Sequence, residues 1–475
     1  MTPLPDVLSI QPFTKPAQGE VILPGSKSLT NRALLLAALC DQPVTLTGAL
    51  FSEDTEIMAE ALRRLGIPVT EKEAEKTIRV EGQNGKIPNE NAEIFVGNAG
   101  TAARFLTALC AAAQSGTYKL DGVDEMRRRR PMKGLIDALR AQGAKITYTG
   151  EEGFFPFTIE AHGLIGGDVD IDASKSSQIL SALFMVARLA RKEMWIKSVG
   201  NVRQSFVGMT LQFMSTFGIG GSYSHEKDRF SVGIGTYRSP GVCVIEPDAT
   251  AASYFLALPL VAGGALYLPG LRTTPNQTLQ GDTQFTQVLN SVGANIADRT
   301  EPIYTPDPKN ELDDWQHSIG VDSKFSPTNL RKSITQNFTE FSDTFLTLAA
   351  IAPLLEGTTK ITGIKHTRNQ ETDRVAGMVK ELRKLGQDVD EHEDQDGLTI
   401  TPNLDELQKR AAQGLIEIET YNDHRFAMSF AILGCYDLLK NGRPWLSIKN
   451  PACCAKTFPN FFDVLDQVWK NSHSK

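Results

Sequence analysis

The stretch Leu23–Leu36, LPGSKSLTNRALLL, combines a turn, a group of polar side chains and the start of an apolar helix. Pro24 and Gly25 favour a turn after an apolar pair, and the alanines and leucines that follow have helical spacing. A helix N-terminus presents backbone N–H groups and partial positive charge, to which Lys27 and Arg32 add cationic side chains. The stretch predicts a strand, a turn and a helix with an anion site at its start. A capped surface helix with solvated Lys and Arg is the alternative.

Five segments along the chain share one pattern, in which a helix ends in an apolar residue and a glycine before a strand begins. They are Leu62–Val69, Leu139–Ile146, Phe213–Gly220, Leu289–Ile296 and Leu382–Val389, and their glycines are 77, 75, 75 and 93 residues apart. Glycine recurs just past helix ends because it adopts the left-handed conformation without strain. A sixth helix, from Phe461 to Trp469, lies one period further on and lacks the glycine. Six units of about 75 residues that alternate strands and helices predict an α/β fold.

The longer fourth gap in this repeat locates an insertion. Residues Thr300–Asn337 are rich in Pro, Asp, Asn and Lys. This composition favours turns and loops over regular elements. We therefore expect Pro302–Lys332 to form a surface excursion of irregular structure without a function of its own.

Length and composition restrict the class of protein. A chain of 475 residues suggests two or more domains, and 41% apolar and 22% charged residues are typical of a globular protein. The net charge of -7 argues against a general nucleic-acid binder. Six cysteines, several of them in apolar helical segments, favour buried thiols in a reducing compartment, so we expect a cytoplasmic protein. No signal peptide and no membrane span are expected, and no metal is assigned.

Six further groups of polar residues stand before apolar helices. They are Gly97–Leu106, Asp124–Met132, Ser174–Met185, His366–Arg374, Thr420–Met428 and Ala452–Phe462. We expect Thr101 to cap a helix that begins at Ala102, and Pro131 to lie in the first turn of a helix with Arg130 near its N-cap. Each group alone is also compatible with ordinary capping or with a solvated charged face.

Together these helix starts carry seven cations, which are Lys27, Arg32, Arg104, Arg130, Arg374, Arg425 and Lys456. If these side chains converge, their ligand should carry several negative charges. Asp343 and Glu371 remain for general acid–base chemistry, and His424 is available for proton transfer or orientation. The sequence contains no Walker motif, dinucleotide fingerprint, Ser-His-Asp triad or metal cage that would indicate another class of enzyme.

Nine motifs in order resemble the 5-enolpyruvylshikimate-3-phosphate (EPSP) synthase family. They are PGSKSLTNRALLLAAL, GNAGTAARFLTAL, RRPM, SSQILSAL, EPDATAASYFLA, QGDTQF, ETDRVAGMVKELRKLG, TYNDHRFAM and AKTFPNFF, and they run from Ile22 to Phe462. The resemblance implies two domains of three βαβαββ repeats each, the enolpyruvyl transferase inside-out barrel, with the active site in the cleft between them. One domain would comprise residues 1–26 with 247–475, and the other 27–246. The six-unit repeat, found independently, agrees with this organisation.

The same resemblance implies a reaction in the shikimate pathway of aromatic amino-acid biosynthesis. The enolpyruvyl group of phosphoenolpyruvate would be transferred to the 5-hydroxyl of shikimate-3-phosphate, giving 5-enolpyruvylshikimate-3-phosphate and phosphate. No cofactor or metal is implied, and family members are commonly monomers. A side chain at Gly100 would crowd the phosphoenolpyruvate site. We therefore expect glyphosate, which resembles phosphoenolpyruvate in charge, to inhibit the protein.

The resemblance also assigns residues to roles, position by position. The shikimate-3-phosphate contacts would be Lys27, Ser28, Arg32, Ser176, Ser177, Gln178, Arg203, Asp343 and Gln370. The phosphoenolpyruvate contacts would be Lys27, Gly100, Arg130, Gln178, Arg374, Arg425 and Lys456. Four residues, Lys27, Asp343, Glu371 and His424, would be catalytic. Asp343 resembles the base near the attacking hydroxyl, and Glu371 resembles the proton donor to the methylene carbon.

Several positions depart from the family pattern. Many members have Lys where this chain has Gln370, and a Ser…Pro-Tyr cluster where it has Arg203 to Phe206; we suggest that Arg203 takes over phosphate binding. Many have Gly where Pro247 stands, which would stiffen the crossing between domains. The arginine run is one residue longer than usual, and the proline that follows makes Arg130 the best match, leaving its three neighbours open.

Two alternatives remain at this stage. UDP-N-acetylglucosamine enolpyruvyl transferase shares the fold and the phosphoenolpyruvate chemistry, but it usually has a reactive Cys in the loop matching 121–131, where this chain has none. A non-catalytic phosphate-binding paralogue would leave the joint presence of Asp343 and Glu371 unexplained. The changes at Gln370 and Phe206 keep this second alternative open.

Overall fold

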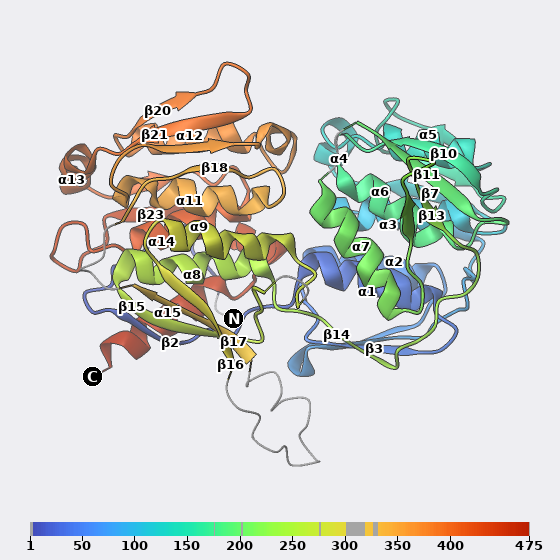
Figure 1. Cartoon of the computed structure of the whole chain (residues 1–475), viewed down its shortest axis with the longest axis horizontal. Coiled ribbons are helices and arrows are strands. Elements are labelled where there is room, and N and C mark those ends of the chain that lie inside the picture. Colours follow the sequence, from blue (N-terminus) through green and yellow to red (C-terminus); the bar gives the residue numbers. More distant parts are fainter. Residues whose placement is uncertain are drawn as a thin grey trace, which may run out of the picture. The chain divides into compact units, whose positions relative to one another are not determined.

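The computed structural model describes residues 3–174, 176–200, 203–274, 277–300, 319–325 and 331–474. The chain divides into two compact units (Figure 1). Unit 1 comprises Met1–Pro24 and Pro247–Lys475, and unit 2 comprises Gly25–Glu246. The chain therefore passes from one unit to the other twice.

Unit 2 contains three four-stranded sheets, with strand orders β14-β3-β5-β4, β6-β7-β9-β8 and β10-β11-β13-β12. Its elements in chain order are α1 (Lys27–Leu39), β3 (Val44–Thr47), α2 (Glu53–Arg64), β4 (Val69–Lys72), β5 (Thr77–Val80), β6 (Asn91–Phe95), α3 (Gly100–Ala112), β7 (Thr117–Asp121), α4 (Asp124–Arg128), α5 (Lys133–Ala141), β8 (Lys145–Tyr148), β9 (Phe157–Glu160), β10 (Gly167–Asp172), α6 (Ser177–Ala187), β11 (Met194–Val199), α7 (Gln204–Thr216), β12 (Ser222–Ser224), β13 (Arg229–Val232) and β14 (Val242–Val244).

Unit 1 contains sheets with strand orders β16-β17-β15-β2, β18-β19-β21-β20 and β1-β23-β22. Its elements are β1 (Val7–Ser9), β2 (Ala17–Glu20), α8 (Ala249–Ala262), β15 (Gly264–Pro269), α9 (Phe285–Ser291), β16 (Asn295–Thr300), β17 (Ile319–Phe325), β18 (Thr335–Asn337), the 3₁₀ turn η3 (Ser342–Thr344), α11 (Phe345–Ile351), β19 (Thr359–Thr362), η5 (Lys365–Asn369), α12 (Arg374–Lys384), β20 (Asp388–Glu391), β21 (Gly397–Thr401), α13 (Leu404–Gln413), β22 (Ile416–Ile418), α14 (His424–Gly434), β23 (Leu446–Lys449), η6 (Pro451–Lys456) and α15 (Phe461–His473).

Each of the six sheets contains one parallel pair of strands. In four of them a helix lies between the two parallel strands in the sequence; a third strand pairs antiparallel with the second, and where a fourth is present it pairs antiparallel with the third, as in β6, β7, β9 and β8. The sheet of β22 and β23 follows the same rule, with β1 from the chain start as its antiparallel strand. A parallel pair requires a crossover connection, which the intervening helix supplies. The predicted α/β class is confirmed.

The two crossings occur at equivalent points of the repeat. Strand β2 pairs in parallel with β15 of unit 1, although the chain continues from β2 into α1 of unit 2. Strand β14 pairs in parallel with β3 of unit 2, although the chain continues into α8 of unit 1. Each unit thus completes a sheet with a strand whose following helix belongs to the other unit.

In each unit, the helices that follow the first strand of each parallel pair pack against one another in the core. In unit 2, α3 packs against α1 and α6, and in unit 1, α14 packs against α8 and α11. All 13 residues of α3 are buried, which explains why its sequence has no polar face. The five repeat glycines, Gly66, Gly143, Gly218, Gly293 and Gly386, all have φ between +80° and +116°, so their predicted left-handed conformation is confirmed.

The insertion differs from the expectation in one part. Strand β17, Ile319–Phe325, lies inside the predicted irregular excursion and pairs antiparallel with both β15 and β16. Val321, Ser323 and Phe325 alternate as buried residues along it, which is the period of a strand. The prediction of irregular structure is therefore wrong for this segment, whose alternation was hidden by polar neighbours. Residues 301–318 and 326–330 of the excursion lie outside the described residues.

None of the helices that the structure describes is both long enough and apolar enough to cross a lipid bilayer. The six cysteines are free thiols, and Cys40, Cys110 and Cys435 are buried as predicted. Burial raises the pKa of the Cys40 thiol to about 12. These thiols contribute to packing as small apolar side chains.

Candidate active site

In unit 1, the predicted residues meet around the guanidinium of Arg374, the first residue of α12, which is 2% exposed. Its Nε donates to Asp423 Oδ2 at 2.7 Å, its Nη1 to Asp343 Oδ1 at 2.9 Å, and its Nη2 to Glu371 Oε2 at 2.9 Å. Nη1 also donates to the side-chain oxygen of Gln370. Three carboxylates from three different helix starts thus converge on one buried arginine.

Two further cations complete this group. Arg425 Nη2 donates to Asp343 Oδ2 at 2.7 Å, and Lys456 Nζ lies 3.1 Å from Glu371 Oε1. Asp343 therefore bridges Arg374 and Arg425, while Glu371 bridges Arg374 and Lys456. We call these residues the unit 1 cluster, which consists of Asp343, Glu371, Arg374, Asp423, Arg425 and Lys456.

The unit 1 cluster shifts the ionisation of its arginines. Burial lowers the pKa of Arg374, but the charges of Asp423, Glu371 and Asp343 outweigh burial, and the pKa lies above its ordinary value. Burial also lowers the pKa of Arg425, but the charge of Asp343 raises it, and the pKa lies above its ordinary value. Both guanidinium groups are therefore locked in the charged form, as buried charges are when carboxylates surround them.

Helix capping holds one carboxylate of the unit 1 cluster, Asp423, in place. Asp423 is the N-cap of α14, and its Oδ1 accepts from Arg425 N at 2.9 Å while Oδ2 binds Arg374. The capping alternative is thus confirmed at this helix start, and a functional role stays a prediction. The ring of His424 is 1% exposed, with Nδ1 3.7 Å from Asp423 Oδ1. Its role in proton transfer stays a prediction.

In unit 2, the buried cation is Arg32 on α1, which is 1% exposed. Its Nε donates to Thr210 Oγ1 at 2.9 Å, its Nη2 to Ser181 Oγ at 3.1 Å, and its Nη1 to the carbonyl of Ser28 at 3.0 Å. Within the described part of the chain, no carboxylate lies in ion-pair range of this guanidinium. Burial alone lowers the pKa of Arg32 to about 9, so the group stays protonated at neutral pH.

Lys27, the first residue of α1, lies near a carboxylate that the sequence analysis missed. Its Nζ is 3.5 Å from Oδ2 of Asp54, a residue in the first turn of α2 that is 2% exposed. Asp54 stands between the exposed Glu53 and Glu56, so the composition of this turn does not distinguish it. Position along the helix distinguishes Asp54 from the two glutamates, because Asp54 lies on the same buried helix face as Met58 and Ala61.

The start of α6 is joined to the start of α3. Gln178 Nε2 donates to Thr101 Oγ1 at 3.0 Å, and Ser176 caps α6 by accepting from Gln178 N at 3.3 Å. Ser177 is buried in the same turn. Helix α3 begins at Gly100 with Ala99 as N-cap, so the prediction that Thr101 caps a helix starting at Ala102 is wrong. The Thr101 hydroxyl instead accepts from Gln178.

Gly100 lies directly against two arginines. A Cβ atom on Gly100 would lie 2.4 Å from Arg130 Nη1 and 3.1 Å from Arg104 Nη1. Arg104 also donates from Nη1 to the Gly100 carbonyl at 2.8 Å and from Nη2 to the Pro131 carbonyl at 3.3 Å. A side chain at position 100 would therefore require the Arg130 guanidinium to move.

The arginine run does not start a helix as predicted. Arg130 lies between α4, which ends at Arg128, and α5, whose N-cap is Met132. The prediction that Pro131 lies in the first turn of a helix is therefore wrong, because α5 begins at Lys133; Arg130 lies two residues before the N-cap Met132. Arg127 pairs with Asp121, with an Nη2–Oδ2 distance of 2.6 Å.

The departure at Arg203 has a structural counterpart. Arg203 is the N-cap residue of α7, and its guanidinium carbon lies 4.8 Å from the ring centroid of Phe206. A cation over an aromatic face is held by the ring quadrupole. The two departures from the family pattern are therefore one contact. A role for Arg203 in binding phosphate stays a prediction.

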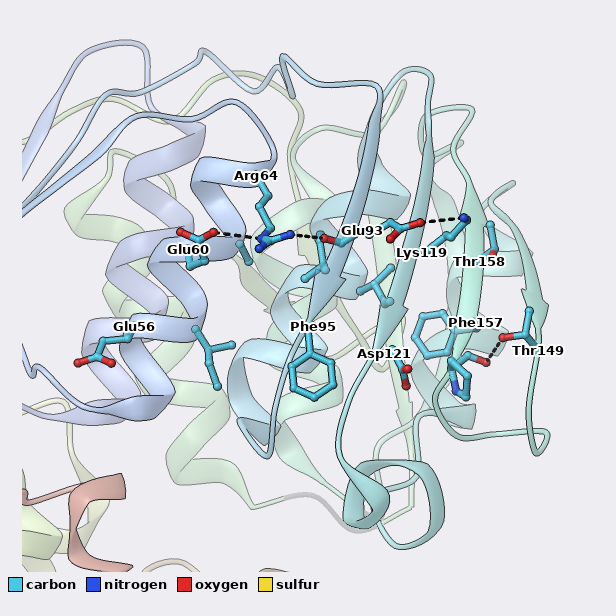
Figure 2. Close-up of a pocket in the computed structure, with 15 residues that line it drawn as sticks. Glu56, Glu60, Arg64, Glu93, Phe95, Lys119, Asp121, Thr149, Phe157 and Thr158 are labelled. Atoms are coloured by element: carbon cyan, nitrogen blue, oxygen red, sulfur yellow. Dashed lines mark hydrogen bonds and ion pairs between the residues drawn. The ribbon is translucent and has the colours of Figure 1, made fainter.

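A groove of about 830 Å³ opens elsewhere on unit 2, between α2 and the strands β6, β7 and β9 (Figure 2). The half-exposed ring of Phe95 lies in it. Arg64 pairs with Glu60 at 3.1 Å and Lys119 with Glu93 at 2.9 Å along its rim, as Figure 2 shows. None of the predicted site residues lines this groove, so it is separate from the clusters described above.

The fold matches that of solved enolpyruvyl transferases. EPSP synthase from Acinetobacter baumannii superposes with a TM-score of 0.76 at 23% identity, over 97% of this chain and 98% of that one. The enolpyruvyl transferase NikO from Streptomyces tendae superposes with a TM-score of 0.70 at 14% identity, over 97% of both chains. The protein therefore has the two-domain enolpyruvyl transferase fold.

Sequence comparison narrows this class. The family described as EPSP synthase (3-phosphoshikimate 1-carboxyvinyltransferase) matches residues 13–465. A 3-phosphoshikimate 1-carboxyvinyltransferase from Opitutus terrae is 55% identical over 474 residues, 99% of each chain. One from Trichormus variabilis is 39% identical over 458 residues, 96% of this chain and 98% of its own. The chain belongs to the EPSP synthase family, whose members are transferases.

Proposed function

We propose that this protein transfers the enolpyruvyl group of phosphoenolpyruvate to the 5-hydroxyl of shikimate-3-phosphate, releasing phosphate. Two curated relatives that carry the name of this activity support it over the UDP-N-acetylglucosamine alternative. The observation that carries the chemistry is the unit 1 cluster, in which Asp343 and Glu371 are both bound to the buried Arg374. Such a site can hold a polyanion and move protons beside it.

In the addition step, Asp343 takes the proton of the 5-hydroxyl as its oxygen attacks C2 of phosphoenolpyruvate. Glu371 gives a proton to the methylene carbon, so that a tetrahedral ketal forms. In the elimination step a proton of the new methyl group returns to Glu371, the bond between C2 and the phosphate oxygen breaks, and the C=C double bond re-forms, giving the enol ether and phosphate. A general acid or base placed in this way contributes about 10²–10⁴-fold to a rate.

The ion pairs of the unit 1 cluster explain how a carboxylate there can carry a proton. Glu371 is bound by Arg374 at 2.9 Å and by Lys456 at 3.1 Å, and Asp343 by Arg425 at 2.7 Å. The phosphate and carboxylate of phosphoenolpyruvate compete for the same three cations. Occupation of the cations by substrate therefore frees an oxygen of Glu371 to take up the proton that it delivers.

The remaining roles follow the family pattern. We assign phosphoenolpyruvate to Lys27, Gly100, Arg130, Gln178, Arg374, Arg425 and Lys456, and shikimate-3-phosphate to Lys27, Ser28, Arg32, Ser176, Ser177, Gln178, Arg203, Asp343 and Gln370. The buried guanidinium of Arg32, which bonds only neutral groups, supports an anionic ligand there. Gln370 accepts from Arg374, so it also orients the phosphoenolpyruvate contact. His424 is assigned to orientation or proton transfer at the start of α14.

The proposal extends to the organisation of the protein. Residues 1–26 with 247–475 form one functional domain and residues 27–246 the other. The enzyme acts as a monomer in the cytoplasm without a cofactor.

Phosphate release on mixing the protein with both substrates tests the reaction. We expect release that needs shikimate-3-phosphate and phosphoenolpyruvate together and that collapses in Asp343→Asn, which keeps the shape of the side chain but cannot accept the proton. Release with UDP-N-acetylglucosamine in place of shikimate-3-phosphate would support the sister activity. No release with either acceptor would support the non-catalytic paralogue.

A further inference from the structure

The turn that leads into Asp423 has an unusual backbone. Thr420 accepts from Asp423 N at 2.8 Å, and the two residues between them, Tyr421 and Asn422, have φ of +54° and +57°. Two positive φ values in the centre of a turn are typical of the type I′ geometry, which favours Asn, Asp and Gly. Asn422 fits this preference. Tyr421 does not, because a bulky side chain disfavours the left-handed region.

One face of α12 holds this turn. Residues 374, 377 and 381 lie on that face, since they are spaced by three and four positions. Arg374 binds Asp423, and a Cβ on Gly377 would lie 2.8 Å from Phe426 and 3.3 Å from the Tyr421 ring, so the helix passes very close to the turn. The third position, Glu381, is fully buried.

The carboxylate of Glu381 receives donors from the segment before Asp423. Tyr421 Oη donates to its Oε1 at 2.6 Å and Glu419 N donates to its Oε2 at 3.2 Å. Lys384 Nζ also donates to Oε2, and it donates to the Glu417 carbonyl at 2.9 Å. Burial and the hydrogen bond to Glu381 raise the pKa of Tyr421, so the hydroxyl remains a donor.

We propose that Glu381 is a positioning residue, which holds Tyr421 in its left-handed conformation and thereby fixes Asp423 against Arg374. The inference rests on the proposed function, in which Arg374 binds phosphoenolpyruvate. Glu381 itself touches no residue of the unit 1 cluster among the described side chains. Its effect reaches the cluster along the backbone, from Tyr421 through Asn422 to Asp423, whose carboxylate binds Arg374.

Tyr421→Phe is the test variant, because it removes one hydroxyl and leaves the ring in place. Its matched control is Tyr237→Phe in unit 2, which removes a buried tyrosine hydroxyl that donates to the Met185 carbonyl at 2.9 Å. We expect similar small losses of Tm in both variants. The KM for phosphoenolpyruvate should rise about tenfold in Tyr421→Phe, the factor for one hydrogen bond to a charged group, and stay within twofold in the control.

A positioning role and a merely structural role give different kinetics. A structural role lowers the fraction of folded enzyme, so kcat falls and both KM values stay unchanged. The positioning role raises the KM for phosphoenolpyruvate and leaves that for shikimate-3-phosphate within twofold. Glu381→Gln provides a second arm, since its amide N–H would face the donors of Lys384 and Glu419. Its effect should be smaller in the Tyr421→Phe background than in the wild type.

The two proposals fail separately. A wild-type protein that releases no phosphate from the two substrates overturns the proposed function. A wild-type protein that is active, with an unchanged KM for phosphoenolpyruvate in Tyr421→Phe and additive effects in the double variant, overturns the positioning role of Glu381 alone.

Discussion

Arg374 of unit 1 and Arg32 of unit 2 are both buried, yet their surroundings have opposite effects. Arg374 is bound by three carboxylates, and its pKa lies above the ordinary value. Arg32 is bound by two hydroxyls and a carbonyl, and burial lowers its pKa to about 9. A buried charge costs free energy unless it is paired. Unit 1 therefore carries a neutralised arginine, whereas the partners of Arg32 among the described residues are neutral.

This contrast separates two tasks. Carboxylates that neutralise Arg374 are also the groups able to move protons, so binding and acid–base chemistry share one network. Neutral partners hold Arg32 in position without competing for its charge. Under the proposed function, a substrate phosphate or carboxylate would gain the full attraction of Arg32, while a ligand of Arg374 would have to displace Glu371 or Asp343.

Removal of Asp343 should have the largest effect, because this residue is the proposed proton acceptor and also bridges Arg374 and Arg425. Asp343→Ala should reduce phosphate release by about 10²–10⁴-fold, the contribution of a general base. Steady-state release with both substrates measures it, and Asp343→Asn should be nearly as inactive. A rate above a tenth of the wild type in Asp343→Asn would exclude Asp343 as the base.

Exchange of each arginine for methionine should separate the two units by stability. Arg374→Met strands three carboxylates and should lower the free energy of unfolding by about 3–5 kcal/mol, the usual cost of breaking a buried pair. Arg32→Met should not lower it, because the exchange removes a buried charge that no carboxylate pairs among the described residues. Thr210 and Ser181 retain each other as partners at 2.9 Å.

Denaturant titration of the substrate-free protein measures both changes. Arg32→Met should nevertheless lose shikimate-3-phosphate binding. Equal destabilisation by the two exchanges would contradict the difference between the arginines.

A methyl group at Gly100 should act more mildly. In Gly100→Ala the new Cβ would lie 2.4 Å from Arg130 Nη1, so the guanidinium must move. We expect the KM for phosphoenolpyruvate to rise about tenfold, the loss of roughly 1.4 kcal/mol of binding, and inhibition by glyphosate to weaken. Wild-type protein that is not inhibited by millimolar glyphosate would contradict the expected inhibition.

A further effect, confined to alkaline pH, is a dependence of stability on the ionisation of Arg32. Its pKa is about 9 in the folded protein against an ordinary 12.5, so above pH 9 the unfolded chain binds more protons than the folded one. Stability from this group therefore rises with pH, by up to about 1.4 kcal/mol per pH unit between 9 and 12.5. The difference in unfolding free energy between wild type and Arg32→Met, measured from pH 8 to 10.5, isolates this contribution. A difference that does not change with pH would contradict it.

Much of the site was predictable because local rules place it. Helix starts that carry Lys27, Arg374 and Arg425 combine capping residues, backbone N–H groups and cations within a few positions of the sequence. The repeat glycines follow from the same kind of rule, since each helix ends in a residue with left-handed conformation, which glycine adopts without strain. The residue types therefore predict both the elements and their ligand class.

What the sequence did not predict depends on long-range packing. The contact of Lys27 with Asp54 is set by how α1 packs on α2. The first turn of α2 contains three acidic residues, and the sequence does not show which of them lies near Lys27. Strand β17 has the period of a strand for only a few residues inside a polar segment. Pro131 lies outside the first turn in which it was predicted, because α5 begins at Lys133, after Met132.

The order in which paired strands occur along the chain has a consequence for synthesis on the ribosome. Unit 2 is one continuous segment, Gly25–Glu246, which can complete its three sheets soon after residue 246 emerges. Strand β1, by contrast, pairs with β23, Leu446–Lys449, near the other end of the chain. At about 5–20 residues per second the first strand waits about 20–90 s for this partner. Strand β2 can pair with β15 once residue 269 is made, whereas β1 is made first and stays without its partner strand until β23 has been synthesised.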